Sequence, residues 1–372
     1  MVGLELVHHQ PQGIDWLREA MRFTNRWRMP LIFMVSGGAI MLALGNRMAG
    51  AFALDRVRRL LLPLAFGMAV LIPPQVYLER VHSGRVTGSF WQWLPEAYSG
   101  VYPAGNLSWH HLWFVAYVLV FTFVLLPLFL WLRTTAGQTA QAAAARVMSR
   151  YGLQWLMALP LAASILWLVP ISRNTNGLTG DWYGLAYYGT FLIYGAFIFG
   201  SPAMLAALNH QRWSSLGVGI AAYTTLYAVY FKGVILPVIA PADRPIYAVL
   251  AAANTLAWLF AAIGFANRYL TMRPKFLAHA TEAVYPVYML HQTGTVIAVY
   301  WLLSFAVPPV VGFLSAAFLT FAVTAALYAG VVRPVPFLRP LFGLKSAYKK
   351  MTRPLSPKSS RSKLMPDFSS ER

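Results

Sequence analysis

The stretch YPVYMLHQTGTVIAVYWLL, residues 285–303, is apolar along most of its length, but His291 and Gln292 lie near its middle. About 20 residues of α-helix cross the roughly 30 Å hydrocarbon core of a bilayer. An imidazole or an amide in hydrocarbon costs several kcal/mol unless it finds a hydrogen-bond partner. The stretch therefore predicts a membrane helix whose polar face turns toward the interior of a helix bundle.

The composition extends this prediction to the whole chain. Of its 372 residues, 58% are hydrophobic and only 11% are charged, whereas soluble domains contain about 25% charged residues. Cysteine is absent, which excludes thiol nucleophiles, disulfides and thiolate metal sites. The sequence also contains no HExxH, GxSxG or Walker motif. We expect an all-α, polytopic integral membrane protein that has the lipid bilayer as a partner and no metal site.

Nine apolar segments approach the length needed to cross a bilayer. They lie at residues 29–46, 60–78, 110–132, 153–171, 183–200, 213–231, 246–267, 282–305 and 308–332. Residues 29–332 are thus expected to form one transmembrane domain, preceded by an extracytoplasmic segment, residues 1–28. The tail, residues 333–372, is basic and rich in serine and proline, which is typical of disordered segments.

Basic residues are unevenly distributed among the connections between these segments. One set of alternate connections carries 11 Lys and Arg residues, and the opposite set carries 5. Because basic loops face the cytoplasm, the first set and the C-terminal tail are predicted to be cytoplasmic. The net charge of +19 is then mainly a topology signal, and no nucleic-acid partner is expected. The four arginines between residues 18 and 28 would lie outside against this rule, so we expect a further helix upstream of Met1.

Two adjacent histidines, His110 and His111, open the third segment in LSWHHLWF. Adjacent residues on a helix point about 100° apart, so one of the two can face the bundle. The flanking tryptophans, Trp109 and Trp113, also fit an interfacial aromatic belt. A functional and an interfacial role therefore both stay open for each histidine.

His291 borders a polar stripe on its own helix, with Tyr285, Tyr288, Gln292 and Thr295 at positions i, i+3, i+7 and i+10. Such a stripe points into the bundle or into a wet cavity. Either the stripe forms the wall of a substrate cavity, or His291 joins two helices through a hydrogen bond.

Two motifs lie in or beside the first two segments. Arg56 and Arg59 share one face of a helix and could clamp the phosphates of a cytosolic ligand, although anchoring by the positive-inside rule explains them as well. Ser36 and Gly37 lie inside the first segment, where small residues allow close approach of a ligand or, more simply, of a neighbouring helix.

The second segment ends in PPQVYLER, which places Pro73 and Pro74 before Gln75 and Tyr77. Proline has no backbone N–H, so the prolines free backbone carbonyls of the preceding turn. Glu79, at the end of this motif, is expected to be solvated rather than catalytic, as is Glu96.

Four motifs occur in a fixed order along the chain: WRMPLIFMVSGG, RVRRLLLPLAFGM followed by PPQVYLE, HHLWF, and YPVYMLHQ. Together they resemble the membrane-bound acyltransferase family three, and most of all its glucan biosynthesis protein C branch. The resemblance implies about ten helices in the inner membrane of a bacterium. It also implies transfer of an acyl group, of acetyl or succinyl type, from cytosolic acyl-CoA to a hydroxyl of an extracytoplasmic carbohydrate. Acyl-CoA would be a co-substrate, and no bound cofactor is expected.

The resemblance also implies roles for particular residues. The family's cytoplasmic RxxR is matched by Arg56 and Arg59, and its SG element by Ser36 and Gly37, all on the acyl-donor side. His291 and His111 are the catalytic candidates. The acceptor cavity would be lined by Gln75, Tyr77, Trp113, Tyr285, Tyr288 and Gln292.

One element of the family is not matched. Its first helix carries a basic residue and, about ten residues later, a histidine that acts as the base, whereas this chain begins with MVGLELVHHQPQG. His8 and His9 do not fit that spacing. Two alternatives therefore stay open: a transporter or flippase of a sugar or lipid-linked substrate, and a catalytically inactive relative.

Overall fold

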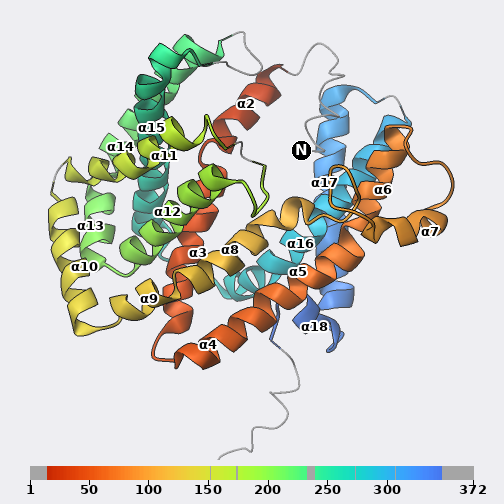
Figure 1. Ribbon diagram of the computed structural model, residues 1–372, viewed down its shortest axis with the longest axis horizontal. Helices are drawn as coiled ribbons and strands as arrows, with labels where there is room; N and C mark the ends of the chain where they lie inside the picture. Colours follow the sequence, from red (N-terminus) through yellow and green to blue (C-terminus); the bar gives the residue numbers. More distant parts are fainter. Residues whose placement is uncertain are drawn as a thin grey trace, which may run out of the picture.

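The computed structural model describes residues 15–150, 152–172, 175–232, 239–272, 274–305 and 307–345 (Figure 1). Within these ranges the chain is helical with connecting loops, and the only β-type pairing is an isolated bridge between Val101 and Leu107. The predicted all-α fold is therefore confirmed. His8, His9 and residues 346–372 lie outside the described ranges.

Helices occur at all nine predicted segments. They are α3 (Arg28–Leu44); the run of α4 (Ala49–Arg56), η1 (Val57–Leu61), α5 (Leu62–Phe66), η2 (Gly67–Leu71) and α6 (Pro73–His82); η4 (His110–Leu112) with α8 (Trp113–Val124) and α9 (Leu126–Leu132); η5 (Leu153–Met157) with α11 (Ala158–Leu168); α12 (Trp182–Phe199); α14 (Arg212–Leu226) with η6 (Tyr227–Phe231); η7 (Pro241–Asp243) with α15 (Arg244–Tyr269); α16 (Lys275–Leu303); and α17 (Pro309–Leu327) with η8 (Tyr328–Val332).

Several of these helices are long and apolar enough to cross a membrane. Among the described residues there are four, Asp15–Leu44, Ala49–His82, Pro241–Tyr269 and Pro309–Val332, or up to seven if each of three bent helix pairs is one span. The chain is therefore a polytopic membrane protein. The total of nine spans stays a prediction.

Among the described residues, three helices of nine or more residues lie outside the segments predicted from the sequence. These are α2 (Asp15–Asn25), α10 (Thr135–Met148) and α13 (Pro202–His210). α2 is rich in charged residues, α10 is rich in alanine and glutamine, and α13 has only 9 residues. None of them carries the long apolar run that marks a spanning helix.

Side chains in the interior form two hydrophobic cores. The larger core lies among α3, α8, α12 and α15, and the smaller core joins α6, the start of α8, α16 and η8. In Figure 1, α8 crosses the middle of the molecule, with α10, α13 and α14 on one side and α6, α16 and α17 on the other. The predicted histidine motifs lie where the two cores meet.

Glycines bring α3 and α12 into close contact. A Cβ atom at Gly37 would overlap the carbonyl oxygen of Leu192, and one at Gly195 would overlap that of Met34. Small residues at such positions let two helix backbones approach each other. Packing thus accounts for Gly37, while the neighbouring Ser36 donates to Ile32 O at 2.8 Å.

The contacts between loops agree with the two sets of connections defined by charge. Arg133 donates to Arg47 O (2.9 Å), and both residues belong to the more basic set. Trp109 donates to Asn176 O (2.9 Å), and both lie in the opposite set. The structure therefore supports the grouping of the loops. Which set faces the cytoplasm stays a prediction.

The start of the C-terminal tail is ordered, which corrects the expectation of disorder from residue 333 onward. α18 (Leu338–Leu341) packs against α5, and Phe342 is 4% exposed in the smaller core. Arg339 also pairs with Glu282 at 3.3 Å. The apolar residues of FLRPLF explain the packing, because burying apolar side chains is favourable. The serine-rich sequence that follows has few such side chains.

Candidate functional site

His111 and His291 meet at the junction of the two cores. Their ring centroids are 5.3 Å apart and the rings are nearly perpendicular. Tyr288, one helical turn before His291, donates from its hydroxyl to the His111 carbonyl oxygen at 2.5 Å. The structure therefore brings together three predicted site residues from α16 and from the turn that opens α8.

The hydrogen bonds of the two imidazole rings show which nitrogen of each ring carries the proton and which carries the lone pair. His111 Nε2 lies 3.1 Å from Met289 O, and His291 Nδ1 lies 2.5 Å from Tyr288 O. A carbonyl oxygen only accepts, so these nitrogens carry the protons, and in a neutral imidazole the other nitrogen holds a lone pair. His111 Nδ1 is buried, and none of the described residues forms a hydrogen bond with it. The pair thus presents two basic nitrogens, His111 Nδ1 and His291 Nε2.

The guanidinium of Arg28 lies close enough to act electrostatically on His291. Arg28 is the first residue of α3, so a third helix borders the site. A positive charge near the His291 imidazole favours negative charge that develops beside this ring. No motif in the sequence predicted a role for Arg28 at the site.

A line of tyrosines extends from the histidine pair along α16. Tyr285 stacks on Tyr288, with a centroid distance of 6.3 Å and an angle of 11° between the rings. The backbone of Gly343 lies against the Tyr285 ring and next to Arg59 O, and its φ of +71° suits glycine. The predicted Tyr285 and Tyr288 therefore connect the histidines with the helical turn that carries Arg59.

Arg56 and Arg59 share one carboxylate. Asp55 accepts from Arg56 Nη2 and from Arg59 Nε, both at 2.8 Å, and Arg47 approaches the same carboxylate at 3.5 Å. Two guanidinium groups around one carboxylate leave a net positive charge, and such groups bind phosphate well. The cluster can therefore hold an anion or anchor the helix, and its role toward an acyl donor stays a prediction.

The remaining predicted residues lie at different distances from the histidine pair. Gln75 is buried, and its side-chain amide donates to Thr293 Oγ1 (2.8 Å) and Leu71 O (3.2 Å), so it contacts α16. Gln292 is half-buried on the same helix. Tyr77 instead contacts the loop after α6, because its hydroxyl donates to Gly88 O at 2.8 Å.

Trp113 belongs to the larger core rather than to the line of tyrosines on α16. Its ring lies 5.2 Å from Tyr117 and 5.3 Å from Tyr188, centroid to centroid. Packing of this kind positions the turn that carries His111, two residues earlier. A contact between Trp113 and the acceptor stays a prediction.

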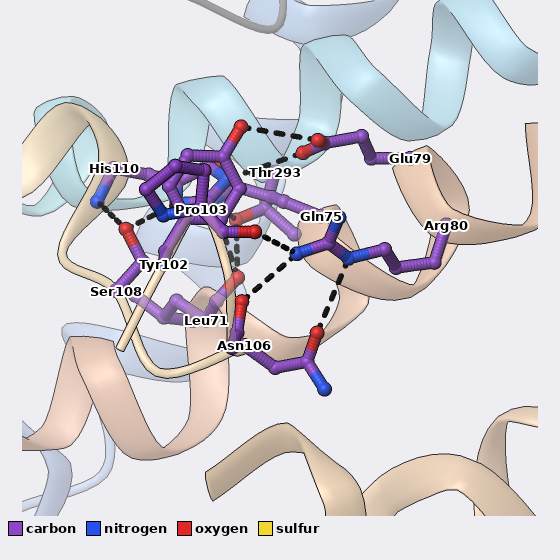
Figure 2. A network of polar contacts seen from close by, with 11 residues as sticks. Leu71, Gln75, Glu79, Arg80, Tyr102, Pro103, Asn106, Ser108, His110 and Thr293 are labelled. Carbon is purple, nitrogen blue, oxygen red and sulfur yellow. Dashed lines mark hydrogen bonds and ion pairs between the residues drawn. The ribbon is translucent and has the colours of Figure 1, made fainter. Parts of the chain in front are cut away.

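A second polar cluster, which the sequence analysis missed, surrounds Glu79 and Arg80 near the end of α6 (Figure 2). Glu79 accepts from the Tyr102 hydroxyl at 3.1 Å, and its other carboxylate oxygen lies 3.7 Å from His110 Nε2. Arg80 donates to Asn106 Oδ1 and to two loop carbonyl oxygens at 2.8–3.2 Å. The loop after α6 is therefore bound to the helix that it leaves.

This cluster corrects one expectation from the sequence and decides between two alternatives that the sequence left open. The Glu79 side chain is only 15% exposed, so the prediction that it is solvated is wrong. His110 is 7% exposed and bonds through Nδ1 to Ser108 Oγ at 2.7 Å, so it is not a belt residue. Its φ of +39° is rare for a residue with a side chain and is found mostly where the surroundings enforce it.

The comparison with known proteins agrees with this architecture. A family model described as an acyltransferase domain, that of acyltransferase family 3, matches residues 3–329. No curated protein and no solved structure matches the chain. The match covers most of the sequence, so the chain belongs to this family of membrane acyltransferases.

Proposed function

We propose that the protein is an O-acyltransferase of the glucan biosynthesis protein C type. It transfers an acetyl or succinyl group from cytosolic acyl-CoA to a hydroxyl of an extracytoplasmic glycan. The uneven distribution of basic residues supports a cytoplasmic C-terminus, and the family resemblance supports a location in the inner membrane of a bacterium. Family membership supports the reaction class.

The observation that carries this proposal is the histidine pair with its two free lone pairs. Acyl transfer to a hydroxyl needs a base, because the oxygen must lose its proton as it attacks the thioester carbonyl. Neutral imidazoles suit this task near pH 7. His111 Nδ1 is also shielded from water, so a substrate hydroxyl would supply the hydrogen-bond donor that this nitrogen lacks.

The residues then have the following roles in the reaction. The acceptor hydroxyl donates to His111 or His291, its oxygen forms the new ester bond, and the bond between the acyl carbon and sulfur breaks. The proton taken up by the imidazole leaves with the CoA thiolate. Arg28 would stabilise the negative charge that develops on the carbonyl oxygen, and Arg56 and Arg59 would bind the CoA phosphates.

The test uses the purified full chain in lipid vesicles, with labelled acetyl-CoA or succinyl-CoA and a neutral gluco-oligosaccharide. Formation of the labelled ester is the readout. We expect His111→Ala and His291→Ala each to lower kcat by about 10²–10⁴-fold, the usual contribution of general acid–base catalysis. His279→Ala is the matched control, because His279 lies on the same helix but is exposed.

Each alternative gives a different result in this assay. Movement of the oligosaccharide across the membrane without consumption of acyl-CoA would identify a transporter. Absence of ester formation by the unmodified chain would identify an inactive relative. Ester formation that is unaffected by both histidine variants would contradict the assigned site.

A further inference from the structure

A pocket of about 180 Å³ lies at the end of α6, apart from the histidine pair. α6, the loop after it and the last turns of α16 form its walls. Among the lining residues are Glu79, Arg85, Tyr102, Tyr300 and Leu303. None of the residues assigned to the acyl donor or to the histidine pair lines it.

Glu79 gives this pocket an incompletely paired hydrogen-bond acceptor. A carboxylate can accept about four hydrogen bonds, and the described residues donate one, from Tyr102. His110 Nε2 faces the other oxygen at 3.7 Å, which is too long for a hydrogen bond. Buried carboxylates are normally well paired, whereas Glu79 Oε2 has no hydrogen-bond partner among the described residues. A ligand that donates to it would complete the pairing.

The other walls indicate the kind of donor. Arg80, the nearest cation to Glu79 along the helix, already bonds to three loop oxygens. Arg85 and His82 also line the pocket, so its polar part combines a carboxylate acceptor with basic groups. Such a set suits hydroxyl groups, which both donate and accept hydrogen bonds. Tyr300 and Leu303 provide apolar surface beside these groups, whereas the Arg80 guanidinium lies over the Tyr102 ring, 5.5 Å from its centroid. A sugar ring has this combination, with an apolar face and hydroxyl donors at its edge.

We propose that this pocket binds one sugar ring of a neutral, hydroxyl-rich acceptor, with a ring hydroxyl donating to Glu79. Tyr102 and His110 hold the carboxylate in place. The inference rests on the proposed function, because it takes the sugar to be the acceptor of the acyl group.

The pocket and His291 lie along the same helix, α16. Val296 lines the pocket, and His291 lies five residues earlier on α16, which is about 7.5 Å along a helix. Between them, Thr293 bonds to Gln75, one helical turn before Glu79 (Figure 2). A ring next to the one bound in the pocket would reach the histidines only past this buried Gln75–Thr293 hydrogen bond.

The experiment measures binding alone. The full chain in lipid nanodiscs is titrated with a neutral gluco-oligosaccharide in the absence of acyl-CoA, with calorimetry as the readout. We expect Glu79→Gln to weaken binding roughly 10-fold or more, the usual effect of losing a hydrogen bond to a charged group. Glu96→Gln makes the same chemical change at an exposed position of the same loop and should bind as the unmodified chain does.

A second variant tests the same pocket without removing a polar partner. Leu303→Trp fills the rim of the pocket from an exposed position, and its control, Ile297→Trp, places the same bulk on another exposed position of α16. We expect Leu303→Trp to weaken oligosaccharide binding at least 10-fold by steric exclusion, and Ile297→Trp to leave it unchanged. Leu303→Trp keeps the proposal testable if Glu79→Gln fails to fold.

The outcomes separate this inference from the proposed function. Binding that is lost in both pocket variants, in a chain that forms no ester, would support the pocket and contradict the acyltransferase. Ester formation with an unchanged KM for the oligosaccharide in both variants would overturn the pocket and leave the acyltransferase in place. Binding of inorganic phosphate instead of the oligosaccharide would also overturn it.

Discussion

Tyr117 and His111 lie six residues apart, yet the buried polar networks around them differ. Tyr117 donates to Asp181 at 2.6 Å, and Asp181 also accepts from the backbone N–H of Gly184 and of Asn176. Asp181 is fully buried and caps α12. His111, by contrast, has one nitrogen bonded to a carbonyl and the other without a partner.

This difference indicates that the buried polar group of Asp181 serves the structure, whereas that of His111 serves the function. A buried carboxylate that accepts three hydrogen bonds recovers the cost of leaving water, so it stabilises the fold. A buried lone pair without a donor costs free energy in the empty protein. Such a group is retained where a ligand completes it. Variants on the Asp181 side should therefore change stability, and variants on the His111 side should change activity.

The largest effect is expected at Asp181. Asp181→Ala leaves the backbone N–H groups of Asn176 and Gly184 without their acceptor, and each such buried group costs about 1–3 kcal/mol. The Tyr117 hydroxyl keeps the carbonyl oxygen of Gly177 as an acceptor at 3.0 Å. We expect the free energy of unfolding to fall by about 3 kcal/mol or more, measured by denaturant unfolding in detergent micelles. Asp243→Ala is the control, because Asp243 also precedes a helix but makes no capping hydrogen bond there. An Asp181→Ala variant with unchanged stability but impaired catalysis would contradict the structural role of Asp181.

Gly37 is expected to have the next largest effect. Gly37→Ala forces α3 away from α12, and overpacking of this kind costs about 1–3 kcal/mol. The apparent melting temperature should fall while the KM for acyl-CoA stays unchanged. Gly50→Ala, where an added Cβ meets open space, should not lower the melting temperature. A raised KM at full stability would instead favour the donor role implied by the family resemblance.

Arg59 sharpens the functional side of the comparison. Arg59→Ala removes one of two guanidinium groups, and a lost charge-assisted hydrogen bond corresponds to roughly a 10-fold change in affinity. We expect the KM for acyl-CoA to rise by about that factor, with kcat little affected. Arg58→Ala, an exposed position in the same turn, is the control for the loss of charge. An equal rise in both variants would indicate a general electrostatic effect rather than a clamp.

The smallest effect is expected at Tyr288. Tyr288→Phe removes the hydrogen bond that fixes the His111 backbone, which is worth about 0.5–1.5 kcal/mol. We expect kcat to fall by a few-fold while the melting temperature changes little. Tyr285→Phe is a close control, since the Tyr285 hydroxyl is buried without a hydrogen-bond partner among the described residues. If both variants behave alike, the hydrogen bond to His111 has no role in catalysis.

Hydropathy predicted the helices of this molecule well. All nine apolar segments contain helix, because a run of about 20 apolar residues has few other stable conformations in a membrane. The freed carbonyls before Pro73 and Pro74 were also predicted correctly, since Ala69 O accepts from Tyr98 and Leu71 O accepts from two side chains. Helices such as α10 and α13 were missed because their stability comes from packing rather than from a long apolar run.

The site was predicted in part. The polar stripe on α16 indicated that His291 faces the bundle, and the structure brings it to His111. Glu79 and His110 were missed because their burial depends on a loop that folds back over 20 residues later, and no local pattern reports such a contact. Their roles in catalysis and binding stay predictions.

The two consecutive histidines have a mechanical consequence. His110 belongs to the Glu79 cluster and His111 to the pair with His291, and their Cα atoms are only about 3.8 Å apart. The backbone turn that joins them is held on one side by Ser108 and on the other by Tyr288. A shift of this turn moves both histidines, so the two clusters cannot rearrange independently.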